Sequence, residues 1–403
     1  MSSLPTVIVR PGEADRLLAG HPWLYQGSIL RLTQPAADGD LVQVKDHRQR
    51  FIGVGFYNSR SKIQVRLLAW ERVEINRQYL AQRIQAALEV RRRQLPQASS
   101  FRVVNAEADL LSGLIVDRYE DVLVLQTSSL GMDLRKPDLV AALRTVLEPR
   151  AILERNDVAS RKFEGLPDVS GVLFGAVEPE MIVRLNGLEF HAELSSGHKT
   201  GLYLDQQLNY ERVAGLLTGR PGAQVLDCFS FVGGFALHAA RAGAARVQAI
   251  EQSPEATALA QRNAQRNQLA GVCVFETANV FDWLKTQTAV RAHEVTVPRY
   301  DLIVLDPPSF TRNRASVPDA LRGYKEIHLR ALKLLKPSGV LVTFCCSHHV
   351  DAGLFEEVIV AAAFDARRWL RRVATFGASP DHPVLPSIPE TEYLKGFAFE
   401  IVR

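Results

Sequence analysis

Five short apolar runs separated by helical stretches fill the second half of this 403-residue chain, and they constrain the fold more than any other feature. The runs are AQVLDCFS, RVQAIEQS, VCVFETAN, YDLIVLDPP and GVLVTFCCS, and the stretches between them include SPEATALAQRNAQRN and YKEIHLRALKLLK. Strands that alternate with helices predict an α/β fold, a mostly parallel sheet with helices on both faces. Ligands of such sheets bind at the carboxyl ends of the strands. The residues that end each run are therefore the first candidates for a functional site.

The first half of the chain has a different pattern. Short β segments (PTVIV, GDLVQVKD, RFIGVGFY and SKIQVRLLAW) predict a small β-rich module. Helical spacing from Asn76 to Leu95, with arginines such as Arg91 among the polar positions, favours a solvated amphipathic helix over an RNA-contacting one. Strand-like segments around one helix then indicate a second, α+β domain. We predict three domains, at residues 1–74, 75–189 and 190–403.

Composition excludes several classes of protein. The N-terminal MSSLPTVIVRPGEADR lacks the apolar core of a signal peptide, and no segment is apolar enough for a membrane span, so we expect a cytoplasmic protein without a membrane partner. The 4 cysteines have the spacing of neither a secreted disulfide framework nor a zinc ribbon. Lysine and arginine outnumber acids by 48 to 44, which is compatible with a polyanionic partner but does not establish one.

The first three runs end in residues suited to a nucleotide-like cofactor. Asp227 ends the first run, and Gly233 and Gly234 follow at the start of a helix, where glycines let a ligand approach the backbone. Glu251 ends the second run, where an acid binds ribose hydroxyls in related folds or serves as a helix N-terminal charge. Asn279 ends the third, as an adenine contact or a helix cap. The pair of acids favours an adenosine-containing cofactor.

The last two runs end in a carboxyl group and in two thiols. The fourth ends in LDPPSF, where two prolines stiffen the backbone after Asp306. The fifth ends in Cys345 and Cys346, shortly before His348 and His349. Although these four are zinc ligands by type, adjacent ones project in different directions and lack the usual spacers, so we expect no metal. We expect the histidines in a solvated loop. The other cysteines are expected in the core: Cys228 and Cys273.

Further segments narrow the interpretation. They are HPWLYQGSI, IVDRYEDVLVLQ, ERNDVASRKFEG, SSGHKTGLYLDQQ, RGYKEIH and YLKGFAFEI. With the runs above they resemble, over nearly the whole chain, the ribosomal RNA large subunit methyltransferase I family, class I S-adenosylmethionine-dependent enzymes that form 5-methylcytosine in 23S rRNA. The resemblance implies an N-terminal PUA domain, a central α+β domain and a Rossmann-like methyltransferase domain. It implies S-adenosyl-L-methionine as cofactor and 23S rRNA as partner, and it is compatible with a homodimer.

The resemblance also assigns roles to residues. Cofactor binding falls to a segment that closes over the methionine part, to the first loop, and to the ribose and adenine contacts: Thr200, Asp205 and Gln206; Asp227, Phe229, Ser230, Gly233 and Gly234; Glu251 and Asn279. Basic and aromatic residues after the DPPSF loop suit phosphate contact and base stacking, although a solvated helix start is an equal alternative for each: Arg322, Tyr324 and Lys325.

Methylation of cytosine C5 requires covalent catalysis, because this carbon is a poor nucleophile. A cysteine thiolate adds to C6, and an acid at N3 stabilises the adduct. Asp306 and the cysteines end neighbouring strands about 4.8 Å apart, which predicts Asp306 as the acid. In the family the nucleophile follows a phenylalanine and one small residue, which favours Cys346 and leaves Cys345 as the alternative.

Two other functions fit parts of the sequence. An enzyme of the same fold that methylates a guanine nitrogen needs no cysteine, and relatives of that kind carry asparagine at this position. A non-catalytic RNA-binding assembly factor would use the β-rich N-terminal module alone. Trapping of a covalent RNA adduct separates both functions from the cytosine enzyme.

Overall fold

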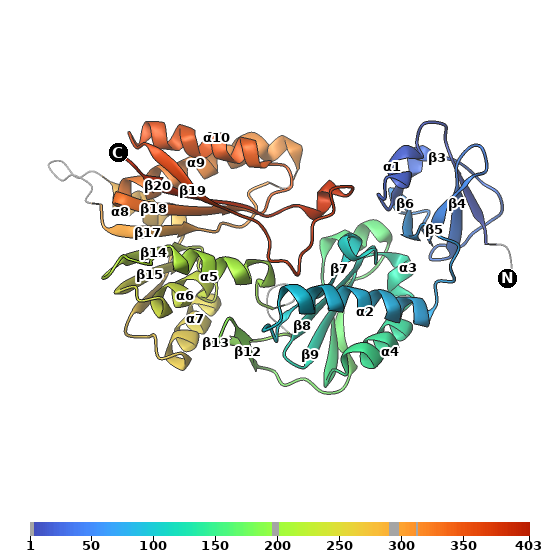
Figure 1. Ribbon diagram of the computed structural model, residues 1–403, viewed down its shortest axis with the longest axis horizontal. Helices are drawn as coiled ribbons and strands as arrows, with labels where there is room; N and C mark the ends of the chain where they lie inside the picture. The colour runs from blue at the N-terminus through green and yellow to red at the C-terminus, as the bar shows by residue number, and fades with distance from the viewer. Residues whose placement is uncertain (1–3, 196–200, 290–297, 312) are drawn as a thin grey trace. The chain divides into compact units, whose positions relative to one another are not determined.

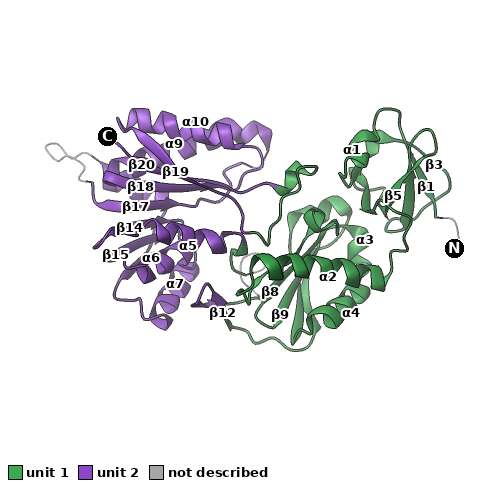
Figure 2. Ribbon diagram, viewed as in Figure 1, with its two compact units in different colours: residues 1–183, 192–204, 380–391 green, residues 184–191, 205–379, 392–403 purple. Residues whose placement is uncertain are grey.

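The computed structural model describes residues 4–195, 201–289, 298–311 and 313–403 (Figure 1). The chain forms two compact units (Figure 2). Unit 1 comprises residues 1–183, 192–204 and 380–391, and unit 2 comprises residues 184–191, 205–379 and 392–403. Because unit 1 joins the β-rich N-terminal segment to the segment that follows it, the three-domain division stays a prediction. No helix among the described residues is long and apolar enough to cross a bilayer.

The N-terminal part of unit 1 is a six-stranded sheet in the order β2-β6-β5-β4-β1-β3. Its strands and one short helix are β1 (Thr6–Val9), α1 (Asp15–Leu18), β2 (Trp23–Tyr25), β3 (Ile29–Leu32), β4 (Leu41–Lys45), β5 (Phe51–Tyr57) and β6 (Ile63–Ala69). Side chains of β4 alternate between buried and half-buried, as expected for a strand with one face on the core. The predicted β-rich module is confirmed.

The second part of unit 1 is a five-stranded sheet in the order β11-β10-β9-β8-β7, with helices packed against it. Its elements are α2 (Arg77–Gln94), β7 (Phe101–Asn105), β8 (Leu114–Tyr119), β9 (Val122–Thr127), α3 (Leu130–Asp133), α4 (Lys136–Leu147), β10 (Ala151–Asn156), the 3₁₀ helix η3 (Ala159–Glu164) and β11 (Val169–Phe174). A separate two-stranded sheet follows: β12 (Met181–Leu185) and β13 (Leu188–Ala192).

Helix α2 confirms the predicted solvated helix, because Arg77, Arg92 and Arg93 are exposed. Asn76 caps it by accepting the N–H of Tyr79 at 3.0 Å. Arg91, however, is fully buried, because its guanidinium donates to both carboxylate oxygens of Asp109, at 2.5 and 2.7 Å. It also donates to the carbonyl of Arg102 at 3.0 Å. A planar guanidinium paired in this way can be buried at little net cost.

Unit 2 contains a seven-stranded sheet in the order β16-β15-β14-β17-β18-β20-β19. Its strands are β14 (Gln224–Cys228), β15 (Arg246–Glu251), β16 (Cys273–Thr277), β17 (Tyr300–Leu305), β18 (Leu335–Cys345), β19 (Leu370–Phe376) and β20 (Lys395–Ile401). Its helices are α5 (Gln207–Gly215), α6 (Gly234–Arg241), α7 (Pro254–Arg266), α8 (Val280–Thr288), α9 (Val317–Leu334) and α10 (Ala352–Asp365). Strands β14 to β18 are parallel, and β20 joins antiparallel.

Helices cover both faces of this sheet (Figure 1). Helices α9 and α10 lie on one face and α5, α6 and α7 on the other. The first face forms a large apolar core in which Leu305 and Cys345 of the sheet pack with Tyr324 of α9 and Phe355 of α10. The predicted mostly parallel, doubly covered sheet is therefore confirmed.

Candidate active site

Three predicted acids share one face of the unit 2 sheet at its carboxyl edge. Asp227 on β14 pairs with Val304 on β17, and Asp306 stands two residues beyond Val304. On its other side Asp227 pairs with Ala249 of β15, two residues before Glu251. Because side chains alternate with a period of two, the three carboxyl groups point to the same side of the sheet.

A strained loop connects the end of β14 to α6. Phe229 and Phe231 have positive φ angles of 64° and 48°, which residues other than glycine seldom adopt. The N–H groups of Phe229 and Ser230 both donate to the carbonyl of Ile250, at 2.9 and 3.1 Å. The N–H of Phe231 donates to Glu251 Oε2 at 2.9 Å. These bonds fold the loop against the end of β15. Sequence reasoning missed Phe231, because the role belongs to its backbone.

Buried polar atoms in this loop lack partners. Asp227 Oδ2 accepts the N–H of Ala236 at 3.0 Å, but Asp227 Oδ1 and Ser230 Oγ are buried without a hydrogen-bond partner in the described part of the chain. Burial, together with the negative charges of Asp306 and Glu251, raises the pKa of Asp227 well above its usual value. Such atoms fit a cofactor that carries hydrogen-bond donors and positive charge, as S-adenosylmethionine does.

Glu251 is already engaged by its own backbone surroundings. In addition to Phe231, the N–H groups of Gln252 and Ser253 donate to its Oε1 at 2.7 and 2.9 Å. A carboxylate accepts about four hydrogen bonds, so these three leave room for a ribose hydroxyl. The ribose contact of Glu251 stays a prediction.

Asn279 forms the helix cap that was the alternative to an adenine contact. Its Oδ1 accepts the N–H groups of Phe281 and Asp282 at 3.0 and 3.3 Å at the start of α8. Its side-chain amide nitrogen would be the atom left for an adenine ring. That contact stays a prediction.

Gly233 and Gly234 are glycines for different physical reasons. Gly233 has a φ of +89°, which favours glycine at the start of α6. Gly234 is instead required by a neighbour, since an added Cβ would lie 2.5 Å from Cζ of Tyr210 on α5. Close packing of α5 against α6 therefore explains Gly234 without a ligand.

The segment predicted to close over the cofactor contacts the other predicted residues. Thr200 lies outside the described residues. Gln206 donates from Nε2 to Asp306 Oδ2 at 3.1 Å, and Asp205 Oδ2 accepts the hydroxyl of Tyr393 at 2.6 Å. The structure thus brings together Gln206 and Asp306, which are 100 residues apart in sequence.

The register of β18, continued one residue past its end, predicts that Cys346 lies on the face of the three acids. Thr343 on β18 pairs with Leu305 on β17. One step further along, Asp306 comes level with Phe344, so these two side chains share a face. Cys346 stands two residues beyond Phe344, just past the end of the strand, and is half-buried.

Cys345 lies in a different environment. It is fully buried in the core under α9 and α10, and its thiol donates to the hydroxyl of Tyr324 at 3.4 Å. Cys228 and Cys273 are core residues, as predicted. Burial raises the pKa of the Cys273 thiol to about 12 and that of the Cys228 thiol well above its usual value. Among the four cysteines, Cys346 is the one with partial exposure.

A lysine that sequence reasoning missed also reaches this edge. Lys395 begins β20 opposite Cys345, and its Nζ donates to the carbonyl of Ser347 at 2.6 Å. Burial lowers the pKa of Lys395, while the neighbouring thiols Cys345 and Cys346 oppose that shift. Lys395 belongs to YLKGFAFEI, one of the segments that carry the family resemblance, but the resemblance assigned no role to a residue of this segment.

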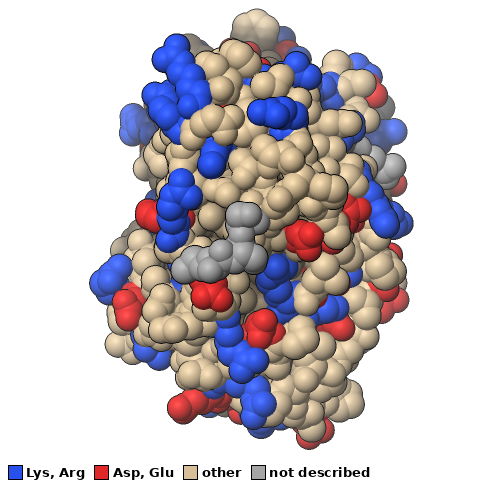
Figure 3. Space-filling view, turned by 90° about the vertical axis from the view of Figure 1, so that its right-hand side faces the viewer, with Lys and Arg blue, Asp and Glu red and all other residues tan. Residues whose placement is uncertain are grey.

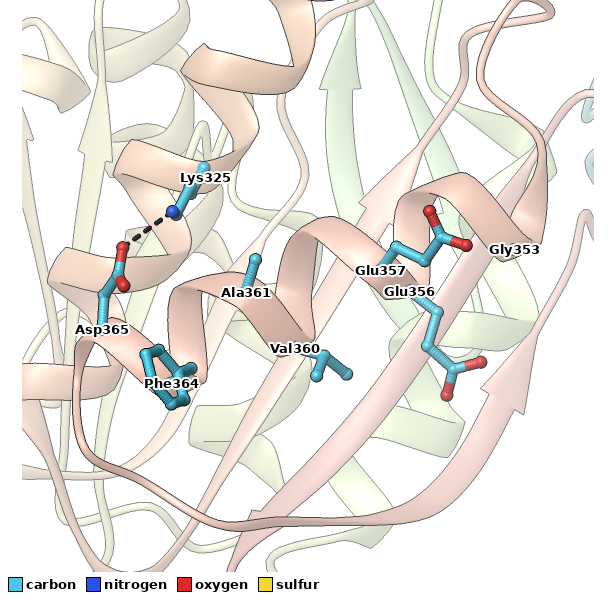
Figure 4. Close-up of a pocket in the computed structure, with 8 residues that line it drawn as sticks. All are labelled: Lys325, Gly353, Glu356, Glu357, Val360, Ala361, Phe364 and Asp365. Atoms are coloured by element: carbon cyan, nitrogen blue, oxygen red, sulfur yellow. Dashed lines mark ion pairs between the residues drawn. The ribbon is translucent and has the colours of Figure 1, made fainter.

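One predicted RNA contact is corrected by burial. Tyr324 is fully buried, with its ring 4.7 Å from that of Phe310 between centroids, so it has no free face for a base. Arg322 is exposed and paired with Asp319. Lys325 pairs with Asp365 at 2.7 Å, at a surface hollow between α9 and α10 (Figure 4). RNA contacts by Arg322 and Lys325 stay predictions.

The histidines after the cysteines lie on the surface. His348 and His349 are exposed, as expected for a solvated loop, and the His348 ring lies 5.9 Å from that of Tyr393. Within the described ranges, no group of three or more His, Cys, Asp and Glu side chains is arranged to hold a metal ion.

Comparison with known proteins identifies the family. PUA-like domains match residues 7–70, and S-adenosylmethionine-dependent methyltransferases match residues 164–385. The ribosomal RNA large subunit methyltransferase I of Shewanella amazonensis is 37% identical over 398 residues, 98% of each chain. The chain belongs to the ribosomal RNA large subunit methyltransferase I family. The family member from Klebsiella pneumoniae is 34% identical over 408 residues, covering 100% of this chain and 99% of its own.

Membership in this family settles the coarse chemistry. The chain is an S-adenosylmethionine-dependent methyltransferase with a PUA-like domain, and S-adenosylmethionine is its cofactor. The crystal structure of SMU.776 complexed with SAH has the same fold, with a TM-score of 0.82 at 22% identity over 98% of this chain and 99% of that one. Family membership agrees with the two buried polar atoms that lack hydrogen-bond partners among the described residues, Asp227 Oδ1 and Ser230 Oγ.

Proposed function

We propose that this methyltransferase modifies carbon 5 of a cytosine in 23S rRNA through a covalent adduct with Cys346. The name of its relatives, ribosomal RNA large subunit methyltransferase I, supports ribosomal RNA of the large subunit as substrate. The observation that carries the chemistry is a partly exposed thiol on the same face as a carboxyl group, Cys346 with Asp306. The proposal implies a cytoplasmic enzyme, and it requires no particular oligomeric state.

The separation of these two residues suits a pyrimidine ring. Asp306 and Cys346 are offset by two residues along neighbouring strands, which corresponds to about 7 Å along the strands and about 5 Å across them. Their Cα atoms are then about 9 Å apart. C6 and N3 are on opposite sides of the cytosine ring. A thiol that bonds to C6 and a carboxyl group that contacts N3 must therefore lie on either side of the ring, with the whole ring between them.

The proposed reaction balances with these groups. S-adenosylmethionine supplies an electrophilic methyl group. The Cys346 thiolate bonds to C6, the C5=C6 electrons shift through C4 to N3, and Asp306 donates a proton there. The methyl group that the cofactor would supply then bonds to C5, and the electron pair of the broken S–CH3 bond would stay on the cofactor sulfur. Loss of the C5 proton to a base restores the C5=C6 bond, expels the thiolate and returns the N3 proton to Asp306.

A trapping experiment tests the proposal. We expect the wild-type enzyme, with S-adenosylmethionine and a 23S rRNA transcript containing 5-fluorocytidine, to form a denaturation-resistant adduct, because fluorine at C5 cannot leave as a proton. Cys346→Ala should form none, whereas Cys345→Ser should retain it. No adduct with the wild type, or an adduct that persists in Cys346→Ala, would contradict the proposal and favour methylation of another atom.

A further inference from the structure

An aromatic ring in unit 1 is exposed on a firmly held turn. Phe163 in η3 is 74% exposed. Its neighbours in the same turn, Arg161 and Glu164, are only 1% and 2% exposed. Single exposed apolar residues are common on protein surfaces and usually carry no function. Phe163 differs from these because two buried charged residues fix the turn that presents it.

Arg161 holds the first half of this turn. Its Nη1 donates to Asp133 Oδ1 at 2.8 Å and to the carbonyl of Thr127 at 2.5 Å. Its Nε donates to the carbonyl of Pro167 at 2.9 Å. A buried guanidinium with this many partners leaves the turn little conformational freedom, so little entropy is lost when a ligand contacts Phe163.

Glu164 joins the turn to the loop between β5 and β6. Its carboxylate accepts from Asn58 Nδ2 at 2.9 Å, from Ser61 Oγ at 2.7 Å and from Arg66 Nη2 at 2.9 Å. Asn58 and Ser61 are part of that loop, which also carries Arg60. The loop of the PUA-like domain and the turn with Phe163 therefore form one surface.

Both segments carry exposed cations. Arg60, Lys62 and Lys162 are exposed. The Arg60 side chain lies against Gly165, where an added Cβ would come within 3.1 Å of its Cδ. Asp38 pairs with Arg60 at 3.3 Å, and Asp168, just beyond the turn, is also exposed. An exposed aromatic face beside several cations is the arrangement by which proteins hold unpaired nucleotides.

We propose that Phe163, Arg60, Lys62 and Lys162 form an RNA contact surface, on which an unpaired base stacks on Phe163 while the cations bind flanking phosphates. This inference rests on the proposed RNA substrate, but it concerns a surface separate from the methyl-transfer chemistry. The flat ring favours RNA over an acidic peptide, which would use the cations and leave the ring without a partner.

Binding of a 23S rRNA transcript to the full chain, measured without S-adenosylmethionine, tests the surface. Because base stacking on an aromatic side chain contributes about 1–3 kcal/mol, we expect Phe163→Ala to weaken binding roughly 5- to 150-fold. Phe163→Trp should retain the affinity. The matched control is Phe364→Ala in unit 2, which removes a phenylalanine 82% exposed and should leave affinity unchanged.

The cations have a separate readout. Lys162→Ala should reduce the slope of log affinity against log salt by about one. Wild-type RNA affinity in Phe163→Ala, or an equal loss of RNA affinity in Phe364→Ala, would contradict the proposed RNA contact surface. RNA binding needs no methyl transfer, so the two experiments are independent. If the wild type forms no 5-fluorocytidine adduct but Phe163→Ala clearly weakens RNA binding, the proposed chemistry is contradicted and the RNA contact surface is supported. If the wild type forms the adduct but Phe163→Ala binds RNA with wild-type affinity, the chemistry is supported and the RNA contact surface is contradicted.

Discussion

Asp227 is the most buried of the three acids in the proposed cofactor site. It is fully buried, one of its oxygens has no partner among the described residues, and two further acids, Glu251 and Asp306, share its face. Burial and these charges raise its pKa. A cofactor with positive charge relieves the repulsion, so the site is built to bind a cation more tightly than a neutral analogue.

Replacement of this acid should change how stability depends on pH. In the unfolded chain Asp227 has a pKa of about 3.9, and in the native state the pKa is raised, so between the two values the native state binds the extra proton. The free energy of unfolding therefore falls as pH rises through that range. We expect Asp227→Asn to flatten this fall, as measured by urea unfolding from about pH 4 to about pH 8. The same substitution should also weaken cofactor binding.

Asp282→Asn, which changes an exposed acid on α8, is the control for this experiment and should keep the wild-type profile. An Asp227→Asn profile identical to that of the wild type would show that the buried carboxyl group does not bind the extra proton.

At the scale of elements, α6 and α9 each carry a buried, neutral histidine. His238 on α6 donates from Nδ1 to the carbonyl of Gly234 at 2.7 Å. His328 on α9 forms a hydrogen bond of 2.8 Å with Thr343 of β18. Burial lowers the pKa of each to about 3. Protonation of either ring would place a charge in an apolar layer, so both helices depend on neutral imidazoles.

This arrangement predicts sensitivity to acid. The unfolded histidines have a pKa of about 6.5, so their contribution to stability is complete above that pH and is lost as pH falls from 6.5 toward the native value of about 3. Each histidine should lower the free energy of unfolding by roughly 1.4 kcal/mol per pH unit in that range. His328→Leu should make the acid limb less steep in thermal or urea unfolding.

The exposed His349→Leu serves as the matched variant and should keep the wild-type acid limb. If His328→Leu loses stability with falling pH as steeply as the wild type, protonation of this ring does not drive acid unfolding.

At the scale of the whole molecule, the formal charge is nearly balanced, with 48 basic against 44 acidic residues. Figure 3 shows Lys and Arg side chains in several separate clusters on one face, with acidic side chains between some of them. The formal net charge is only +4. Long-range attraction to RNA is therefore modest, and we expect local surfaces, such as the one proposed around Phe163, to contribute to the orientation of the RNA.

A buried carboxylate holds the PUA-like sheet to the second sheet of unit 1. Glu164 is 2% exposed and pairs with Arg66 of β6 at 2.9 Å. Its removal leaves a nearly buried guanidinium without its main partner, so Glu164→Ala should cost roughly 3 kcal/mol of unfolding free energy. Thermal unfolding measures this loss.

An exposed ion pair in the same unit provides the comparison. Asp138 pairs with Arg77 at 3.1 Å, and both side chains are largely in solvent. Asp138→Ala should therefore cost less than about 1 kcal/mol. Equal losses in the two variants would contradict the view that Glu164 joins the two sheets.

The sequence by itself determined whatever depends on local period and strand ends. Alternation of apolar runs with helical stretches predicted the parallel sheet, because strand and helix periods are set by a few neighbouring residues. The same locality positioned Asp227, Glu251 and Asp306 at one edge. It also required Cys345 and Cys346 to face opposite sides of a strand.

Only the tertiary structure decided which side chains are buried and which distant residues meet. Arg91 and Tyr324 have the residue types of a solvated helix and an RNA contact, yet both are buried, whereas the apolar Phe163 is exposed. The contact between Gln206 and Asp306 joins segments 100 residues apart. Burial and long-range contacts follow from how remote elements pack together, and no local pattern of residues carries that information.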